Sequence, residues 1–509
     1  MINKVRTAAI TGLEGTCVEI EGLISNGLPY FKVVGLIDAT VKESRERVRG
    51  AISSSGFKFP DRKIIVSLSP GDVKKRGTHF DLPLAICILR ISGQISGNLD
   101  NLDRTAFIGE LSLDGSVKSA SGVLAMVKVL VEAGIKRIVV PYSNRIEASL
   151  IKDAYIVPVK TLSEAIMFLE GNSNTGKYTS HISSFNTYDH ENLDFSQVKG
   201  QEVAKRGICI AASGGHGIMM MGSPSCGKTM LAKRIPYILP SMAYDEILEA
   251  TMVHSVAGLL KEDKPIISKR PFRRPHHSIT RAGMIGGGLN PVPGEISLAS
   301  KGVLFLDELP ELKRDVIEAL RLPLEEKYVP IFRTGRNISF PADFLLVAAC
   351  NPCPCGNYTD PYRECSCSPK EISNYMRKLS GPIMERIDLH IYMEHLDYNE
   401  FTGSAGMSST EMKEIVINAR EIQKKRFRNY NITLNSQMEG SLIESFCNTD
   451  SDSNDILRIA FEKHILTPRT YQKTLKISRT IADMECSSEI KSNHVMESIQ
   501  YRRKLNEYD

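Results

Sequence analysis

The stretch Gly222-Ser-Pro-Ser-Cys-Gly-Lys-Thr229 decides which fold this chain is expected to adopt. It fits the pattern G-x-x-x-x-G-K-[ST] at every fixed position. An apolar run at 218–221 precedes it, and the residues after it can continue as a helix. In this strand, loop and helix context, backbone N–H groups and the helix N-terminus surround phosphate groups. The sequence therefore predicts an α/β unit with a phosphate-binding loop.

The loop is expected to bind ATP together with Mg²⁺. Lys228 is predicted to reach the β- and γ-phosphates, and the Thr229 hydroxyl is predicted to ligate Mg²⁺. The predicted nucleotide-binding residues of this segment are Gly222, Ser223, Pro224, Ser225, Cys226, Gly227, Lys228, Thr229 and Met230.

Two further strand ends supply the polar groups that hydrolysis requires. Val303–Leu306 is an apolar run that leads directly into Asp307 and Glu308. Asp307 is expected to hold Mg²⁺, and Glu308 to polarise the attacking water. The run 344–350 ends at Asn351, whose amide is expected to position that water. These residues together predict an ATPase.

Composition limits the class of protein. A chain of 509 residues is too long for one core, so two or three domains are expected. No apolar run is long enough to span a bilayer, and the N-terminal segment lacks a signal-peptide pattern, so a cytoplasmic protein without a membrane partner is expected. Its eleven cysteines are then expected to be reduced. The net charge of +5 permits a nucleic-acid partner without arguing for one.

The pattern along the chain predicts an α/β protein of several domains. Residues 1–170 form a mixed α/β unit with strands at 63–69, 106–113 and 136–141, and 171–192 are a Gly-, Ser- and Asn-rich linker. Residues 193–395 form a second unit whose continuous apolar runs are typical of a parallel sheet buried on both faces. Residues 396–509 are predicted to be a small helical domain.

A cysteine-rich insert occupies residues 350–367. Cys353 and Cys355 form one C-x-C pair, and Cys365 and Cys367 form a second. Four thiolates brought together by one loop suit tetrahedral Zn²⁺, and the alternative is a reduced, metal-free loop. Cys350 ends a strand and is predicted to be a small core residue.

The sequence leaves the roles of two basic segments open. Residues 327–340 are predicted to form a hairpin with Arg333 and Arg336 near its tip, which suits either contact with a nucleic-acid backbone or plain solvation. The second segment faces DNA, a neighbouring subunit or the nucleotide, and its cationic residues are Arg273, Arg274, His276 and His277.

With these residues in view, the chain resembles the YifB/ComM group of magnesium-chelatase-like AAA+ ATPases over almost its whole length. The matching segments are Gly200-Gln201, Arg273-Arg-Pro-His-His-Ser278, Gly286-Gly-Gly-Leu-Asn-Pro-Val-Pro-Gly-Glu-Ile-Ser297, the acidic strand, Asn351-Pro-Cys-Pro-Cys355 and Gly381-Pro-Ile-Met-Glu-Arg-Ile-Asp388.

The resemblance implies roles that the residues alone do not. Arg386 matches an arginine finger that reaches the γ-phosphate on a neighbouring subunit, which implies a ring, expected to be a hexamer. Arg469 resembles the second sensor arginine of a helical lid and is expected to contact nucleotide. In motors of this clade the predicted hairpin can project into the pore of the ring.

The N-terminal unit resembles the Lon-protease-type fold, which is ribosomal S5 domain 2-like. The matching pieces are 109–115 and 134–141. The Ser–Lys dyad of active proteases is missing, because Leu124 lies near the position of the expected lysine. This unit is therefore expected to be a binding or assembly module.

The residues thus predict an ATP-hydrolysing protein, and the resemblance implies that it is a ring-forming motor. Its expected action is that of a DNA translocase or helicase that promotes branch migration in recombination or natural transformation, which the resemblance to the ComM branch implies. The alternatives are a chelatase-type or chaperone-like remodelling ATPase and, less well supported because the dyad is missing, an ATP-regulated peptidase.

Overall fold

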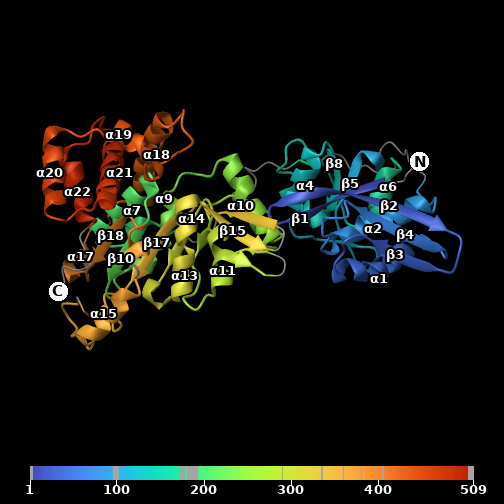
Figure 1. The fold of residues 1–509 in the computed structure, drawn as a ribbon, viewed down its shortest axis with the longest axis horizontal. Helices are drawn as coiled ribbons and strands as arrows, with labels where there is room; N and C mark the ends of the chain where they lie inside the picture. Colours follow the sequence, from blue (N-terminus) through green and yellow to red (C-terminus); the bar gives the residue numbers. More distant parts are fainter. Residues whose placement is uncertain are drawn as a thin grey trace.

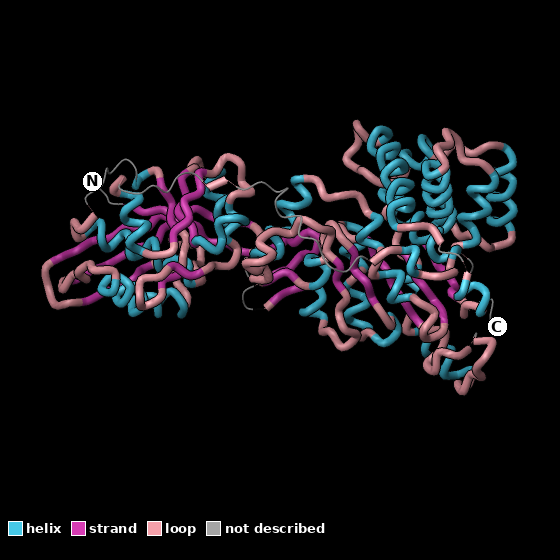
Figure 2. The backbone as a smooth tube through the Cα atoms, turned by 180° about the vertical axis from the view of Figure 1, so that it is seen from behind, coloured by secondary structure: helices cyan, strands magenta, loops and turns pink. Residues whose placement is uncertain are grey.

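The computed structural model describes residues 4–95, 102–171, 178–179, 193–288, 291–333, 336–358, 360–379, 381–403 and 406–502. The chain forms an N-terminal α/β lobe and a second lobe that carries another sheet and a helical bundle (Figure 1). Figure 2 shows strands running through both lobes, with the bundle at one end. Most of the predicted linker at 171–192 lies outside the described residues.

The N-terminal lobe is built on a seven-stranded mixed sheet of order β3-β4-β2-β1-β5-β8-β9. Its strands are β1 Lys4–Thr11, β2 Glu14–Ser25, β3 Tyr30–Val34, β4 Lys63–Ser69, β5 Thr105–Phe107, β8 Arg137–Pro141 and β9 Tyr155–Val159. Its longer helices are α1 Ala39–Ser54, α2 Asp81–Ile91, α4 Val123–Glu132 and α6 Leu162–Leu169. Helix α2 is apolar around most of its circumference, so it forms part of the core.

One predicted strand of this lobe is divided. Residues 106–113 were expected to form a single strand, but β5 ends at Phe107 and a short strand, β6 Glu110–Leu111, pairs with β7 Val117–Lys118 instead. The break falls at Gly109, whose N–H donates to His79 O at 3.1 Å and whose carbonyl accepts from Leu82 N at 3.0 Å. The chain leaves the sheet there because Gly109 bonds to the start of α2.

The second lobe contains a five-stranded parallel sheet of order β11-β14-β17-β10-β18. Its strands are β11 Phe272–Arg273, β14 Val303–Leu306, β17 Leu345–Cys350, β10 Ile218–Gly222 and β18 Leu389–Met393. The three central strands are buried along their whole length, as the continuous apolar runs predicted. Helices of this lobe include α7 Glu202–Gly214, α10 Tyr244–Val256, α13 Arg314–Ala319, α14 Arg321–Glu326 and α15 Pro369–Arg377.

A two-stranded hairpin follows α14. Its strands are β15 Tyr328–Arg333 and β16 Arg336–Pro341, so the predicted hairpin is confirmed, and its turn at 334–335 lies outside the described residues.

Beyond β18 the chain becomes helical, as predicted. The main helices are α18 Ser409–Arg426, α20 Ser451–Glu462, α21 Pro468–Met484 and α22 Ser492–Gln500. Their interior contains Asp483, which accepts hydrogen bonds from Arg426, Arg479 and Asn435. Helices α18 and α21 pack against α7, so the bundle covers one face of the parallel sheet.

The two lobes meet through α4 and α10. Leu124, Leu150, Met252 and Ile266 share an apolar cluster at this junction. Within it, the buried Glu147 carboxylate accepts a hydrogen bond from Ser255 Oγ of the second lobe and one from Asn144 Nδ2, both at 2.5 Å. Burial raises the pKa of Glu147 to about 7, so the junction contains a carboxyl group that titrates near neutrality.

The raised pKa of Glu147 predicts a pH-dependent stability. Between its ordinary value of 4.5 and about 7, the folded state binds more protons than the unfolded state. Stability is therefore lost as pH rises through this window, by roughly 3 kcal/mol at most. Glu147→Gln is expected to remove this pH dependence. The thermal midpoint of the variant should therefore rise relative to that of the wild type as the pH increases from about 5 to about 8. Glu132→Gln, at an exposed carboxylate, is the control. Parallel curves for the wild type and Glu147→Gln would contradict the prediction.

Candidate nucleotide site

The phosphate loop joins β10 to helix α8 Lys228–Ala232, as its pattern requires. Lys228 is buried, and its Nζ donates to Gly222 O at 2.6 Å and to Ser223 O at 2.9 Å, so the ammonium lies inside the loop. Gly222 cannot be replaced without a shift, because a Cβ there would lie 2.4 Å from Met393 O on β18. The loop is therefore packed tightly against the neighbouring strand.

The polar residues predicted from three separate segments meet at one edge of the sheet. Thr229 Oγ1 donates to Asp307 Oδ2 at 3.1 Å, and Lys228 Nζ donates to Asn351 Oδ1 at 3.2 Å. Glu308 follows with φ 51° and ψ 48°, a left-handed conformation that is uncommon for a residue with a side chain and is often found at functional sites. Its carboxylate is half exposed. The arrangement can hold a triphosphate, a divalent cation and a water.

The segment of arginines and histidines also lies at this edge, which the sequence left undecided. Arg274 forms an ion pair with Asp307 at 2.7 Å, and His277 Nδ1 lies 3.2 Å from Glu308 Oε2. Arg273 points elsewhere and forms a two-pronged ion pair with Glu295. Sequence reasoning missed these pairings because the residues lie far apart in the chain.

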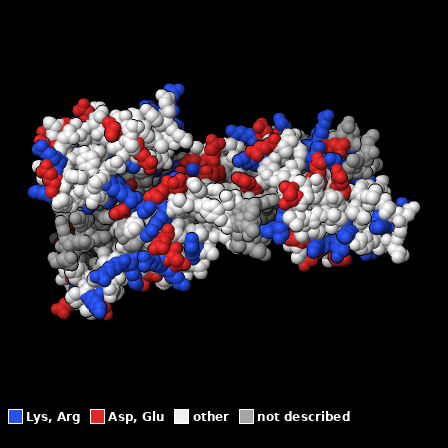
Figure 3. Space-filling view, viewed as in Figure 1, with Lys and Arg blue, Asp and Glu red and all other residues white. Residues whose placement is uncertain are grey.

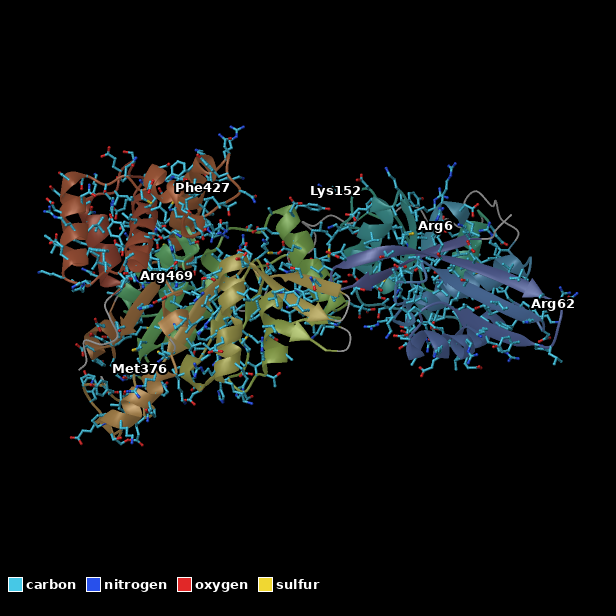
Figure 4. The ribbon with its side chains drawn as sticks, in the orientation of Figure 1. Arg6, Arg62, Lys152, Met376, Phe427 and Arg469 are labelled. Carbon is cyan, nitrogen blue, oxygen red and sulfur yellow. The ribbon has the colours of Figure 1, made fainter. Side chains whose placement is uncertain are left out.

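Arg386 and Arg469 do not join the phosphate loop. Arg386 pairs with Glu325 at 2.7 Å, and Arg469 pairs with Glu385 at 2.8 Å and with the same Glu325 at 3.3 Å. Figure 4 shows Arg469 where the helical bundle meets the sheet. The sequence did not indicate that Glu325 and Glu385 would be the partners of these arginines.

The sheet register places the two arginines away from the nucleotide of their own chain. Arg386 precedes β18, whose Leu389 pairs with Ile218 at the start of β10, whereas the loop begins at Gly222 at its end. Four residues of strand span about 13 Å. Arg386 therefore lies at the amino edge of the sheet, opposite the edge that carries Lys228.

A buried ion network joins this amino edge to the bundle. Asp388 accepts from Lys473 Nζ at 2.5 Å and from His216 Nδ1 at 2.9 Å, and His216 Nε2 bonds to Thr480 Oγ1 at 2.8 Å. Burial alone would raise the pKa of Asp388, but Lys473 and His216 hold it well below its usual range. The network fixes the segment after Arg386 to helix α21.

The four insert cysteines meet in space. The Sγ atoms of Cys353, Cys355, Cys365 and Cys367 all lie within 4.8 Å of one another. Three of the separations are 3.3 to 3.7 Å. Four sulfurs held about 2.3 Å from a tetrahedral Zn²⁺ would lie roughly 3.8 Å apart, so the thiols fit this ion. Cys350 is a buried core residue, as predicted.

The insert contacts the phosphate loop directly. Gly356 has φ 84°, and a Cβ there would lie 2.6 Å from Pro224 Cδ. The loop that carries the cysteines therefore packs on the loop that carries Lys228.

Family models match the chain in three parts. Residues 194–401 match the magnesium chelatase, subunit ChlI model, residues 20–144 match a model of subunit ChlI of Mg-chelatase, and residues 406–502 match the C-terminal ChlI model. No described helix is long and apolar enough to cross a membrane.

Relatives of known sequence cover the whole chain. The chain is 39% identical over 504 residues to competence protein ComM of Haemophilus influenzae, covering 98% of this chain and 97% of that one. It is 38% identical over 503 residues to uncharacterized protein YifB of Escherichia coli, covering 98% and 97%. A weaker match, 22% identical over 331 residues, covers 60% of this chain and 36% of the maternal DNA replication licensing factor mcm6 of Xenopus tropicalis.

The parallel sheet and its phosphate loop define a P-loop ATPase of the AAA+ class. Within that class, the chain belongs to the YifB/ComM family of magnesium-chelatase-like proteins.

The separation of the two edges predicts an active site shared between chains. Arg386→Ala is expected to lower the turnover of ATP about a thousandfold, since a finger stabilises charge that develops in the transition state. Lys228→Ala is expected to be equally inactive. Mixing the two variants should restore part of the activity, because intact loops of one then face intact arginines of the other.

The control is a mixture of Lys228→Ala with the double variant Lys228→Ala/Arg386→Ala, which has no intact loop. Steady-state phosphate release measures both mixtures. If the first mixture is no more active than the separate variants, the active site is not shared between chains.

Proposed function

We propose that this chain is a ring-forming ATP-driven motor, a hexamer that acts on DNA as a translocase or helicase and promotes branch migration. The observation that carries the DNA assignment is the outer face of the β15–β16 hairpin. The name of the Haemophilus relative refers to competence, which favours a role in recombination during natural transformation.

The hairpin has two unlike faces. Val329, Ile331, Ile338 and Phe340 are buried and pack against the body of the protein. On the other face Phe332 is 72% exposed and Tyr328 is 40% exposed. Exposed apolar side chains that share one face can mark an interaction surface.

Exposed aromatic rings beside basic residues suit single-stranded DNA. The sequence places Arg333 and Arg336 on either side of the turn, at the tip of the hairpin one residue beyond Phe332. Bases stack on aromatic rings without regard to sequence, and cations contact the phosphate backbone. Figure 3 also shows Lys and Arg side chains gathered along the lower edge of this lobe, near α13 and α15.

The hydrolytic site would work by in-line attack of water on the γ-phosphate. Lys228 would bind the phosphates, and Thr229 and Asp307 would hold Mg²⁺, which would supply positive charge beside the phosphate oxygens. Glu308 accepts the proton of the water, and Asn351 orients it. Arg386 and Arg469 of a neighbouring chain would complete the site, which places the nucleotide contact of Arg469 between chains.

Hydrolysis with DNA tests this proposal. Forked and four-way DNA are expected to stimulate ATP hydrolysis and to be unwound, with Lys228→Ala as the inactive control. If DNA is neither unwound nor stimulates hydrolysis, remodelling of a protein becomes the better assignment.

Phe332 provides a sharper prediction. Phe332→Ala is expected to weaken binding of single-stranded DNA about tenfold and to lower DNA-stimulated hydrolysis, because a stacked base contributes about 1–3 kcal/mol. Phe332→Tyr keeps the ring and should behave as the wild type, and hydrolysis without DNA should be unchanged in both. Fluorescence of 2-aminopurine in a single strand measures stacking directly. Equal quenching by Phe332→Ala and the wild type would exclude the ring from the contact.

We further propose that the cysteine quartet binds a structural Zn²⁺. The four thiolates would hold the ion and keep the insert folded against Pro224 of the phosphate loop. All eleven cysteines are free, which is consistent with a reducing, cytoplasmic location.

Metal analysis tests the zinc site. The purified protein is expected to contain about one zinc per chain, and Cys353→Ser and Cys367→Ser should each lose it. Both variants should also bind ATP more weakly, because the insert supports the phosphate loop. Cys486→Ser changes an exposed cysteine outside the quartet and is the control. A wild-type protein without zinc would remove this assignment.

The N-terminal lobe is proposed to be a Lon-like binding or assembly module. Its β1–β2 turn reaches the hairpin, since a Cβ at Gly12 would lie 2.5 Å from Ile338 Cγ2. A partner bound to this lobe would therefore act close to the proposed DNA contact.

A further inference from the structure

The segment Arg273–Ser278 begins in strand β11 and then crosses the carboxyl end of strand β14. Strand β11 places Arg273 beside Leu304 of β14, in parallel register. Arg273 is then fixed by its ion pair with Glu295, with both N–O distances at 2.6 Å. The next residues are consequently carried over the end of β14, where Asp307 and Glu308 lie.

Arg274 bonds to the first of these carboxylates, that of Asp307. Its guanidinium bonds to Asp307 Oδ2 at 2.7 Å, the same oxygen that accepts the Thr229 hydroxyl at 3.1 Å. The guanidinium carbon also lies 5.7 Å from the centre of the Phe305 ring, within the range of a cation–π contact. One carboxylate oxygen therefore has two donors that fix its direction.

His277 holds the second acid. Its Nδ1 lies 3.2 Å from Glu308 Oε2, within the distance of an ion pair. Because a carboxylate only accepts, a bond between the two requires the proton on Nδ1. Among the described residues, no other side chain forms a hydrogen bond or an ion pair with the Glu308 carboxylate. That carboxylate is 50% exposed, so without His277 it would rotate between several orientations.

We propose that His277 is a positioning residue of the hydrolytic site, which orients Glu308 as the base, and that Arg274 orients Asp307 in the same manner. This inference rests on the proposed ATP hydrolysis. The Nδ1–H of His277 occupies Oε2 and leaves Oε1 of Glu308 free to take a proton from water. The water oxygen bonds to the γ-phosphorus while the bond from phosphorus to the bridging oxygen breaks, and ADP leaves with that electron pair.

The adjacent histidine offers a matched control. The rings of His276 and His277 lie 4.1 Å apart, so both belong to the same short turn. His276 Nδ1, however, bonds to Ser278 Oγ at 2.8 Å within that turn. A variant at His276 disturbs the same backbone without removing a contact to either acid.

The experiment compares three variants of the full-length protein: His277→Ala, His277→Asn and His276→Ala. His277→Ala is expected to lower kcat about 10- to 100-fold while KM for ATP stays within about twofold, since an oriented base acts on the chemical step. His277→Asn places an amide donor near the position of Nδ1 and should recover kcat to within about threefold. His276→Ala should behave as the wild type.

A double-mutant cycle with Glu308→Gln isolates the mechanism. In that background the base is gone, so His277→Ala should cause no further loss in single-turnover hydrolysis. An equal loss in both backgrounds would overturn the inference. The inference would also fail if His277→Asn did not recover activity although its thermal midpoint equals that of the wild type. If Lys228→Ala hydrolyses ATP as fast as the wild type, the proposed ATPase site fails instead.

Discussion

The parallel pairing of β10, β14 and β17 is the constraint on which the site depends. Register pairs Met220 with Ala349 and Leu306 with Ala348, so the three strands end at the same level. Because parallel strands all point the same way, their carboxyl ends must share one edge. Residues 78 and 123 positions apart, Thr229 with Asp307 and Lys228 with Asn351, therefore come within hydrogen-bonding distance.

The same geometry defines the opposite edge of the sheet, where the strands begin. The amino end of β18 holds Arg386, and the ion pairs of Glu325 join it to Arg469 of the helical bundle. Asp388 lies in the same segment and is buried in a network with His216 and Lys473. A buried carboxylate held by a lysine and a histidine is costly to disrupt, so this segment and the bundle are expected to move together when nucleotide changes.

Elements outside the sheet are fixed to it by close packing. The cysteine insert touches the phosphate loop at Pro224, and the turn of the N-terminal lobe touches the hairpin at Ile338. A densely packed contact transmits a displacement, because protein interiors are hardly compressible. The cysteine insert thus packs directly on the phosphate loop, and the β1–β2 turn packs directly on the hairpin.

The sequence by itself determined the elements whose chemistry is local. The phosphate loop, the acidic strand end, the C-x-C pairs and the hairpin each require only a few adjacent residues with the right side chains, and the structure places all of them as expected. The prediction of one strand at 106–113 was wrong, because the bonds of Gly109 to His79 and Leu82 divide that segment. Those bonds join residues that are distant in the chain, so the local sequence pattern cannot predict them.

Only the tertiary structure decided which charges meet. Arg274 reaches Asp307 across 33 residues, and Arg469 reaches Glu325 across 144. A surface arginine looks the same in the sequence whether it faces DNA, a neighbour or an acid, because its partner depends on strand order and register. The sequence therefore determined that ATP can be bound, and the fold decided that Arg274 and His277 are the residues that contact Asp307 and Glu308.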